Sequence, residues 1–397
     1  MFGAEFVADP YAFYARLRQG PPLIWNHDFC GGAWLVHRHA DVQQALRDPD
    51  LSARRIGGWV ARSALPPSPR LQAFKGLMAR TLVFLDRPRH TRVRRVLNAV
   101  FAPDALRTLE PVIRARCREA AQHLQNNLRA GCADLMRDVC RPLPALVMMD
   151  LLGLRELPVA LFQDWAMRLA RFIGQPTPDA VLLRDTQEAL LDMADCLQSP
   201  RHIAQDGLAW RLLHDDSLSL LGRQERLAQC CMLLFAGYET SRHLLGNMLL
   251  TLIEQDALRQ DLIRRPERIP AAVREFLRHD SPVQYTARRL GQDCRWHGQA
   301  LRKGQLLVLL LGAANRDPSV FPDPQRLDFD RPDQAELSLG HGIHRCLGAG
   351  LVQMEARLAL HALLPLLPTL IAGRGRRLGL PAYRGWESLP VRQAMAA

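Results

Sequence analysis

One cysteine near the C-terminus stands where a reactive thiolate could form. Cys346 lies in a glycine-rich run from Leu337 to Gly350, which is followed by an apolar helical pattern from Leu351 to about Leu364. Backbone N–H groups at a helix start can hydrogen-bond a sulfur and lower the pKa of its thiol. The glycines let the backbone pass close to a flat, bulky group. The pattern predicts a sulfur ligand; a buried, inert thiol is the alternative.

An acid and an alcohol interrupt a second helix, predicted from about Arg223 to Glu254. Gly237, Glu239 and Thr240 follow an apolar run that ends at Phe235. Threonine can turn its hydroxyl onto a backbone carbonyl one turn back, and we expect the helical ladder to open here. A hydroxyl backed by a carboxylate can relay protons through ordered water. The alternative is a polar pair on a solvated helix face.

These motifs resemble those of the cytochrome P-450 family over the chain from about Asp9 to Leu366. The loop match is Gly342, His344, Cys346 and Gly348, although Leu339 stands where the family usually has an aromatic residue. The helix match to the family's (Ala/Gly)-Gly-x-(Asp/Glu)-Thr pattern is complete and consists of Ala236, Gly237, Glu239 and Thr240.

The resemblance implies a haem-thiolate monooxygenase with haem b held through Cys346. An electron-rich sulfur on the iron favours cleavage of the O–O bond. The resemblance assigns the acid-alcohol role to Glu239 and Thr240. The enzyme would use O2 and electrons from a redox partner to hydroxylate or otherwise oxidise a small lipophilic substrate, such as a terpenoid or polyketide.

The two propionates of a haem need cations or hydrogen-bond donors. The residues at the family's propionate-binding positions are His90, Arg94, Arg288 and His344. His90 and Arg94 are four residues apart and therefore share one helix face.

A charged triad is expected behind the haem. Glu275 and Arg278 belong to a predicted helix that begins near Pro270. They share one face of it because they are three residues apart. The resemblance implies that Arg326, from the later segment, joins them. Leu327 stands where the family usually has phenylalanine.

The secondary-structure pattern predicts a mainly α protein with a small β portion, and the resemblance implies the cytochrome P-450 fold. Apolar periodicity is nearly all helical from about Ala102 to Arg278. Leu23–Trp25 and Ala33–Val36 resemble a hairpin, and the apolar run from Gln305 to Leu311 is typical of a buried strand. The segment from Ser52 to Thr81 reads as a long ordered loop over a cavity. No linker or repeat interrupts residues 1–397, so we expect one large domain.

Composition narrows the choice of partner. The net charge is +12, but the arginines are scattered and no basic run with aromatic residues occurs, so we expect no nucleic-acid partner. The sequence has no leader-like start and no apolar stretch of about eighteen residues, which predicts a cytoplasmic protein without a membrane anchor. We also expect a monomer. The resemblance implies a ferredoxin or flavodoxin-type electron donor with its reductase. Arg345, Arg92 and Arg95 could form its basic docking surface.

Nine cysteines without a CxxC pair predict neither a disulfide framework nor a zinc site. The rival functions are a peroxide-dependent haem-thiolate enzyme, a non-catalytic haem-binding sensor, and a cysteine hydrolase using Cys346 with His344. Nothing marks an oxyanion site for the last. Four regions are expected to contact substrate, and they are mostly apolar: residues 52–81, 174–178 and 283–286, and the helix near Phe235.

Overall fold

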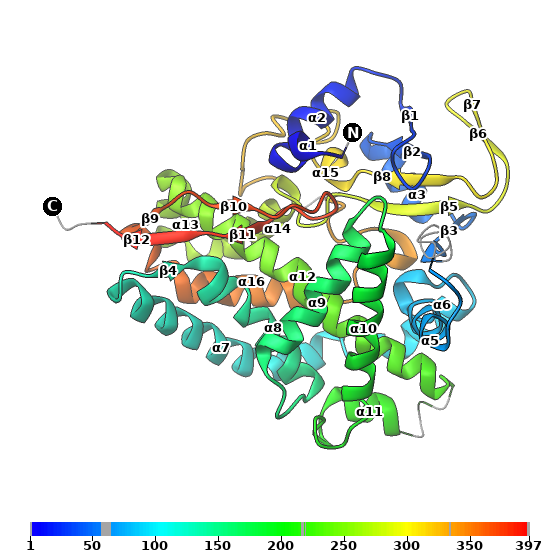
Figure 1. Ribbon diagram of the computed structural model, residues 1–397. Helices are drawn as coiled ribbons and strands as arrows, with labels where there is room; N and C mark the ends of the chain where they lie inside the picture. The colour runs from blue at the N-terminus through cyan, green and yellow to red at the C-terminus, as the bar shows by residue number, and fades with distance from the viewer. Residues whose placement is uncertain (1, 57–64, 216–217, 219, 333–334, 395–397) are drawn as a thin grey trace.

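The computed structural model describes residues 2–56, 65–215, 218, 220–332 and 335–394. Helices make up most of these residues, and the strands form small sheets. Figure 1 shows the largest sheet at the upper right, beside and above the mass of helices. The prediction of a mainly α protein with a small β portion is confirmed.

The helices occupy the chain almost without interruption between residues 103 and 279, as predicted. In chain order they are α1 (Ala4–Ala8), α2 (Pro10–Arg18), α3 (His39–Arg47), α5 (Pro69–Met78), α6 (Arg89–Asn98), α7 (Pro103–Arg129), α8 (Pro142–Leu152), α9 (Val159–Gly174), α10 (Ala180–Cys196), α11 (Leu208–His214), α12 (Arg223–Glu254), α13 (Asp256–Arg264), α14 (Ile269–His279), α15 (Leu311–Ala314) and α16 (Ala349–Leu363).

The largest sheet has five strands in the order β1-β2-β8-β5-β3. The predicted hairpin is present as β1 (Leu23–Asn26) and β2 (Ala33–Val36), which pair antiparallel, and the predicted buried strand is β8 (Leu306–Leu309). The remaining strands of this sheet are β3 (Leu51–Ser52) and β5 (Thr286–Leu290). The smaller sheets contain β4 (Ala133–Asp134), β6 (Cys294–Trp296), β7 (Gln299–Leu301), β9 (Leu370–Ala372), β10 (Arg376–Arg377), β11 (Trp386–Ser388) and β12 (Pro390–Gln393).

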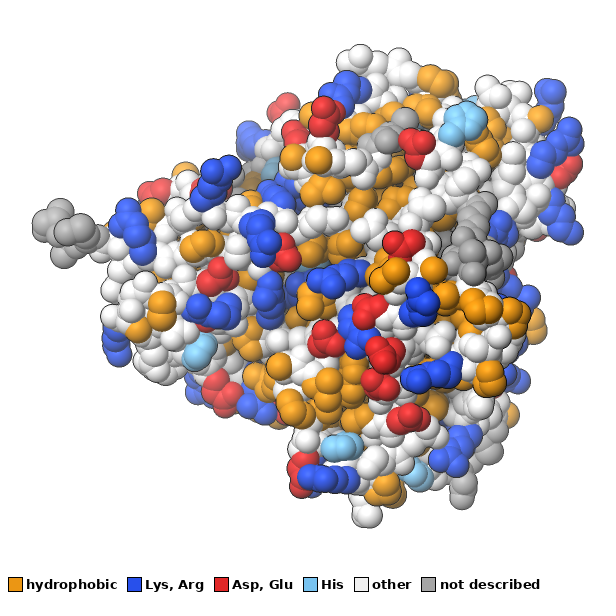
Figure 2. Space-filling view, in the orientation of Figure 1, with side chains coloured by type: hydrophobic (Ala, Val, Ile, Leu, Met, Phe, Trp, Pro, Cys, Tyr) orange, Lys and Arg blue, Asp and Glu red, His pale blue; other side chains and the backbone are white. Residues whose placement is uncertain are grey.

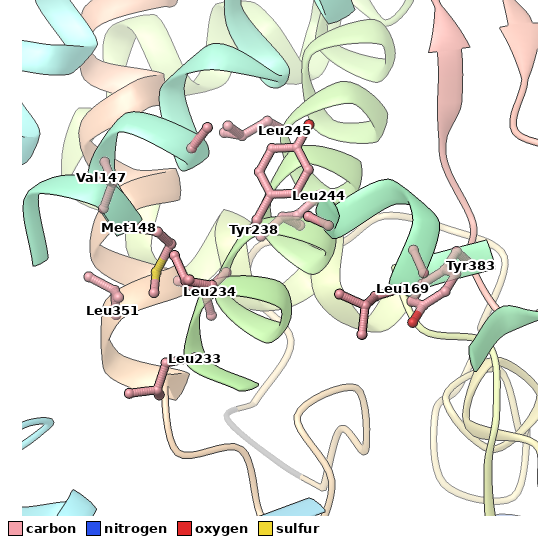
Figure 3. Close-up of a cluster of buried hydrophobic side chains, with 14 of the residues drawn as sticks. Val147, Met148, Leu169, Leu233, Leu234, Tyr238, Leu244, Leu245, Leu351 and Tyr383 are labelled. Atoms are coloured by element: carbon pink, nitrogen blue, oxygen red, sulfur yellow. The ribbon is translucent and has the colours of Figure 1, made fainter. Parts of the chain in front are cut away.

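Helix α12 forms the centre of the core, packed against α8, α9 and α16. Its bounds match the prediction, but the helix is unbroken, so the expected opening of its ladder at Gly237 is wrong. Gly237 instead lets α8 come close: a Cβ here would fall 2.3 Å from Met148 Sδ. Figure 3 shows Met148 between α8 and α12, beside Leu234. Close packing from α8 explains the glycine better than a local break does.

The predicted loop from Ser52 to Thr81 is only partly a loop. Its second half contains α5 (Pro69–Met78), whose start is capped by the Ser68 side chain accepting the Leu71 N–H at 3.1 Å. Residues 57–64 lie outside the described part of the chain. Pro69, at the first helical position, is favourable there because its fixed φ suits a first turn.

The buried triad forms with a different arginine from the one predicted. Glu275 accepts two hydrogen bonds from Arg278, both 2.7 Å long. The Arg326 side chain is 70% exposed and lies near Asp328, whereas Arg331 is 12% exposed, with its Nε 3.3 Å from Glu275 Oε1. Arg326 contributes only its carbonyl, which accepts from Arg278 Nη2. The prediction of Arg326 as the third member of the triad is therefore wrong. The irregular segment places the side chain of Arg331, five positions later, beside Glu275 instead.

All nine cysteines are free thiols. Within the described ranges, no helix is long and apolar enough to span a membrane.

Candidate active site

The Cys346 loop is held in shape by its own backbone. The Cys346 N–H donates to the Leu339 carbonyl at 2.7 Å, so the residue at the usually aromatic position still closes the loop. Gly340 and Gly342 have φ of +70° and +68°, which favours glycine. At Gly342 a Cβ would also fall 2.7 Å from the Leu46 carbonyl oxygen. The loop therefore presses tightly on α3 and delivers Cys346 just before α16.

The sulfur of Cys346 is surrounded by protein and by a cavity. Burial raises the pKa of the thiol, and this outweighs the Gly348 N–H and the charge of Arg94, which lower it. The predicted pKa-lowering N–H at the helix start is thus present, but the net direction in the chain without cofactor is upward. An iron ion bound to the sulfur would supply the positive charge that favours the thiolate.

A cavity of about 160 Å³, which we call the cysteine cavity, separates the Cys346 loop from α12. Its walls carry Cys346, Gly348, Val352, Phe101, Gly237 and Thr240. It lies between a sulfur on one side and the acid-alcohol segment of α12 on the other. The structure thus brings together two motifs that are more than a hundred residues apart in the sequence.

Histidine and arginine side chains gather at one edge of this cavity. The rings of His90 and His344 lie 4.4 Å apart, and His90 Nε2 has no hydrogen-bond partner within the described ranges. Burial, followed by neighbouring arginines, lowers the pKa of His90 to about 4, and burial, followed by Arg288, lowers that of His344 to about 2. Burial lowers the pKa of Arg288 itself to about 10. Such a cluster is complementary to an anion.

Arg94 and Arg55 complete the cluster. Arg94 lines the cysteine cavity and donates to the Arg345 carbonyl at 2.7 Å, which fastens α6 to the cysteine loop. Arg55 was missed by the sequence reading. It is buried, donates to the Ala287 carbonyl at 3.2 Å, and has its pKa lowered to about 9, first by burial and then by Arg288. The sequence did carry a signal for Arg55, because Arg54 and Arg55 are two adjacent arginines directly after β3 and Ala53.

The donor set fits the haem that the resemblance implies. The cavity offers one sulfur, and two arginines, Arg94 and Arg288, and two histidines, His90 and His344, converge at its edge, where two carboxylates would satisfy buried donors such as His90 Nε2. Gly348 lines the cavity, and Gly342 lets the loop pack against α3. All five predicted cofactor-binding residues therefore lie in one region.

Thr240 lies where the cysteine cavity meets a second cavity. As predicted, its hydroxyl donates one turn back, to the Ala236 carbonyl at 3.3 Å. Glu239 is buried beside it and accepts from Arg242 Nη2 at 2.8 Å, with His243 Nε2 at 3.4 Å from the same oxygen. Burial alone would raise the pKa of Glu239, but the charge of Arg242 and the hydrogen bond from His243 outweigh it and lower the pKa.

The second cavity, which we call the apolar cavity, has a volume of about 220 Å³. Each region predicted to contact substrate contributes to its wall, through Thr81, Gln175, Phe235, Val283 and Tyr285, and α9 and the C-terminal segment add Leu169 and Tyr383. Figure 3 shows Leu169 and Tyr383 side by side at this wall. The C-terminal contribution was not predicted, because Tyr383 lies in a short irregular segment without periodicity.

Comparisons with known proteins agree with the geometry. The family model for cytochrome P450 matches residues 184–367. The biotin biosynthesis cytochrome P450 of Bacillus subtilis is 30% identical over 98% of this chain and 97% of its own length. The vitamin D(3) 25-hydroxylase of Pseudonocardia autotrophica is 34% identical over 94% of this chain and 90% of its own.

A solved structure shows the same fold over the whole chain. P450BioI, in complex with an acyl carrier protein ligated to hexadec-9Z-enoic acid, superposes with a TM-score of 0.85 at 30% identity, covering 98% of this chain and 99% of that one. Fold, relatives and the cavity facing a cysteine therefore agree: the chain belongs to the cytochrome P450 family, whose members are monooxygenases that carry haem b.

Proposed function

We propose that Cys346 binds the haem iron and that His90, Arg94, Arg288 and His344 hold the haem propionates. The observation that carries the proposal is the cysteine cavity, which has the Cys346 loop on one wall, Thr240 on the opposite wall and buried cations at its edge. When bound, the haem supplies the chemistry that activates dioxygen. The protein holds it within a single domain, residues 1–397.

Glu239 and Thr240 are proposed to deliver protons during oxygen activation. Thr240 lines both cavities, so its side chain is placed to contact a small molecule bound between them. The Glu239 carboxylate is the adjacent acid and also lines the apolar cavity. A carboxylate next to a hydroxyl can pass protons through water, which is the role that the positions of these two groups support.

The proposed substrate is a small lipophilic molecule, such as a terpenoid or polyketide. The apolar cavity is lined mainly by aliphatic and aromatic side chains, and an apolar pocket with few polar groups binds apolar ligands best. Two relatives point the same way in their names, one through hexadec-9Z-enoic acid and the other through vitamin D(3).

The proposed electron donor is a ferredoxin or flavodoxin-type protein with its reductase. Arg345 and Arg95 are exposed on the side of the cysteine loop, and an acidic carrier would be attracted to them. The face shown in Figure 2 differs, because acidic and basic side chains mingle there over α9 and α10. Arg168, for example, lies within 3.3 Å of Asp164, Asp185 and Glu188.

Turnover of a substrate found by a shift of the haem absorption band tests this function. We expect product to form with a ferredoxin, its reductase and O2, and Thr240→Ala to keep its haem while most of the electrons appear as hydrogen peroxide. Thr251→Ala is the matched control, because Thr251 makes the same bond one turn back on α12, to Asn247. Equal product yield in Thr240→Ala and the wild type contradicts the role of Thr240.

Turnover with peroxide alone separates the rival enzyme. If peroxide supports the same rate as the redox partner and Thr240→Ala leaves that rate unchanged, the protein is a peroxide-dependent enzyme. If haem and ligand bind but neither oxidant gives product, a sensor is the better reading.

A further inference from the structure

A row of buried polar side chains runs along α12 away from the cavities. Glu239, His243 and Asn247 are spaced four residues apart, so they share one helix face. Their exposed fractions are 1%, 0% and 4%. Only the first of them lines a cavity. Because burying polar groups is unfavourable unless they are hydrogen-bonded, a continuous row of this kind calls for an explanation.

Each member of the row has an atom that could take a further hydrogen bond. Glu239 Oε1, both ring nitrogens of His243 and Asn247 Oδ1 have no hydrogen-bond partner within the described ranges. Oε2 of Glu239, in contrast, accepts from Arg242 and lies 3.4 Å from His243 Nε2. Buried atoms of this type are ordinarily satisfied by ordered water, which can join them into one path.

The opposite wall of the row is the C-terminal segment. Gly385 packs against His243 so closely that a Cβ would fall 2.0 Å from Nδ1, so only glycine fits beside this edge of the ring. The Tyr383 ring lies 5.9 Å from the imidazole ring. Asn247 Nδ2 donates to the Arg384 carbonyl at 3.0 Å, which ties the far end of the row to this segment.

The far end of the row reaches a carboxylate near the surface. Asn247 Nδ2 lies 3.4 Å from the Asp280 carbonyl oxygen, and the Asp280 side chain is 19% exposed. Its Oδ1 accepts from Tyr11 at 2.8 Å and from Arg384 at 3.1 Å. The row therefore connects the acid beside the apolar cavity with a polar group that solvent can reach.

His243 is suited to pass a proton along this row. The charged and titratable groups that act on it are Arg242 and Glu239 on its own helix, Arg141 before α8, and Tyr383 opposite. Burial, followed by Arg242, lowers the pKa of His243 to about 4, so the ring is neutral at pH 7. A neutral imidazole has one donor and one acceptor nitrogen, and can take a proton on one while releasing a proton from the other.

We propose that the protons used in oxygen activation reach Glu239 along this row, through His243. The inference rests on the proposed function. A proton that enters from solvent through water on the Asn247 side binds to Nδ1, and the water is restored. Nε2 releases its proton to the Glu239 carboxylate, and the ring ends as the other tautomer; no electrons move. His243 lines neither cavity, so it is a positioning residue that acts through Glu239.

The test compares His243→Phe with His37→Phe, both as haem-loaded protein. His37 is a matched control because it is also a fully buried histidine, with Nε2 3.1 Å from the Pro21 carbonyl, but it lies outside both cavities. In His243→Phe we expect product per electron pair to fall about 10-fold, less than the roughly 100-fold of a group that itself transfers the proton to the reacting atoms, and hydrogen peroxide to rise. Product formed with added hydrogen peroxide is expected to stay unchanged, because the oxygen atoms of peroxide already carry the protons that the row would deliver.

A readout independent of turnover is the ring-nitrogen NMR of labelled His243. We expect a neutral ring with the proton on Nε2, the nitrogen that faces Glu239, down to about pH 4. A ring that titrates near pH 6.5, the ordinary histidine value, would show that it faces bulk water and would overturn the proposal.

Coupling in His243→Phe equal to that of the wild type would also overturn it, provided that the wild type turns over. A wild type without reductive turnover contradicts the proposed function instead. If His243→Phe does not fold, Asn247→Leu decides: lower coupling supports the row, and unchanged coupling overturns it.

Discussion

The two cavities that meet at Thr240 are built from different kinds of sequence. The cysteine cavity takes its chemistry from compact motifs, the loop around Cys346 and the α12 segment that carries Thr240, in which spacing alone sets the geometry. The apolar cavity takes single side chains from many separate elements, from Phe29 to Tyr383. Chemistry is therefore concentrated in a few short segments, whereas the shape of the substrate site is spread over the chain. Changes to the first cavity should remove function, and changes to the second should alter selectivity.

Cys346→Ser is expected to have the largest effect. Without the sulfur the iron loses its ligand. Changes to residues that only support a metal ligand typically cost up to roughly 100-fold, and product formation should fall by more than that here. Product formed per minute under standard conditions measures this. Cys117→Ser, at a buried free thiol, is the control and should keep activity. Comparable activity in the two variants would contradict the special role of the cysteine cavity.

Arg331→Leu tests the scaffold behind the cysteine cavity. The variant leaves Glu275 with one fewer cation in a buried site, on α14, which packs against α16. We expect the free energy of unfolding to fall by about 3 kcal/mol, as is usual when a buried ion pair loses one partner. Denaturant unfolding of the haem-loaded protein measures it.

Arg326→Leu is the matched change, because its side chain is 70% exposed. It should alter the free energy of unfolding by no more than about 0.5 kcal/mol. Equal effects of the two leucine variants would restore the sequence-based assignment of Arg326.

Arg288→Leu sharpens the comparison at the cationic edge of the cysteine cavity. Arg288 is buried, and its charge has a propionate as the proposed partner. We expect haem to dissociate about 10- to 100-fold more readily, as for other groups that support a bound metal cofactor. Haem transfer to an acceptor protein measures the rate. Arg289→Leu, next in β5, is the control; its guanidinium lies instead by the Gly304 carbonyl.

Phe235→Ala is expected to have the smallest effect on catalysis and the clearest effect on selectivity. Phe235 lines the apolar cavity only, so the haem should bind as before. Binding of the native substrate should weaken by about 10-fold, a typical result of removing apolar contact from a pocket, and bulkier molecules should gain. Titration of the haem absorption band measures both. Loss of haem in this variant would show that the two cavities are not separable.

The sequence predicted the chemistry of the site better than its surroundings. The residues of the cysteine loop, the acid-alcohol pair and the predicted propionate-binding residues at 90, 94, 288 and 344 converge as expected, because each belongs to a motif whose spacing is tied to a turn or a helix face. Arg331 could not be told from Arg326, because both follow irregular backbone without a period. Arg55 and Tyr383 were missed for the same reason, and the role of Gly237 depends on a neighbouring helix that no local pattern reveals.

The most direct test of the account is the absorption spectrum of the reduced protein with carbon monoxide, recorded after supplying haem. We predict the strongly red-shifted band of a haem iron ligated by thiolate, and its loss in Cys346→Ser. A spectrum typical of imidazole ligation, or a protein that binds no haem, would contradict the bond between Cys346 and iron on which the proposed function rests.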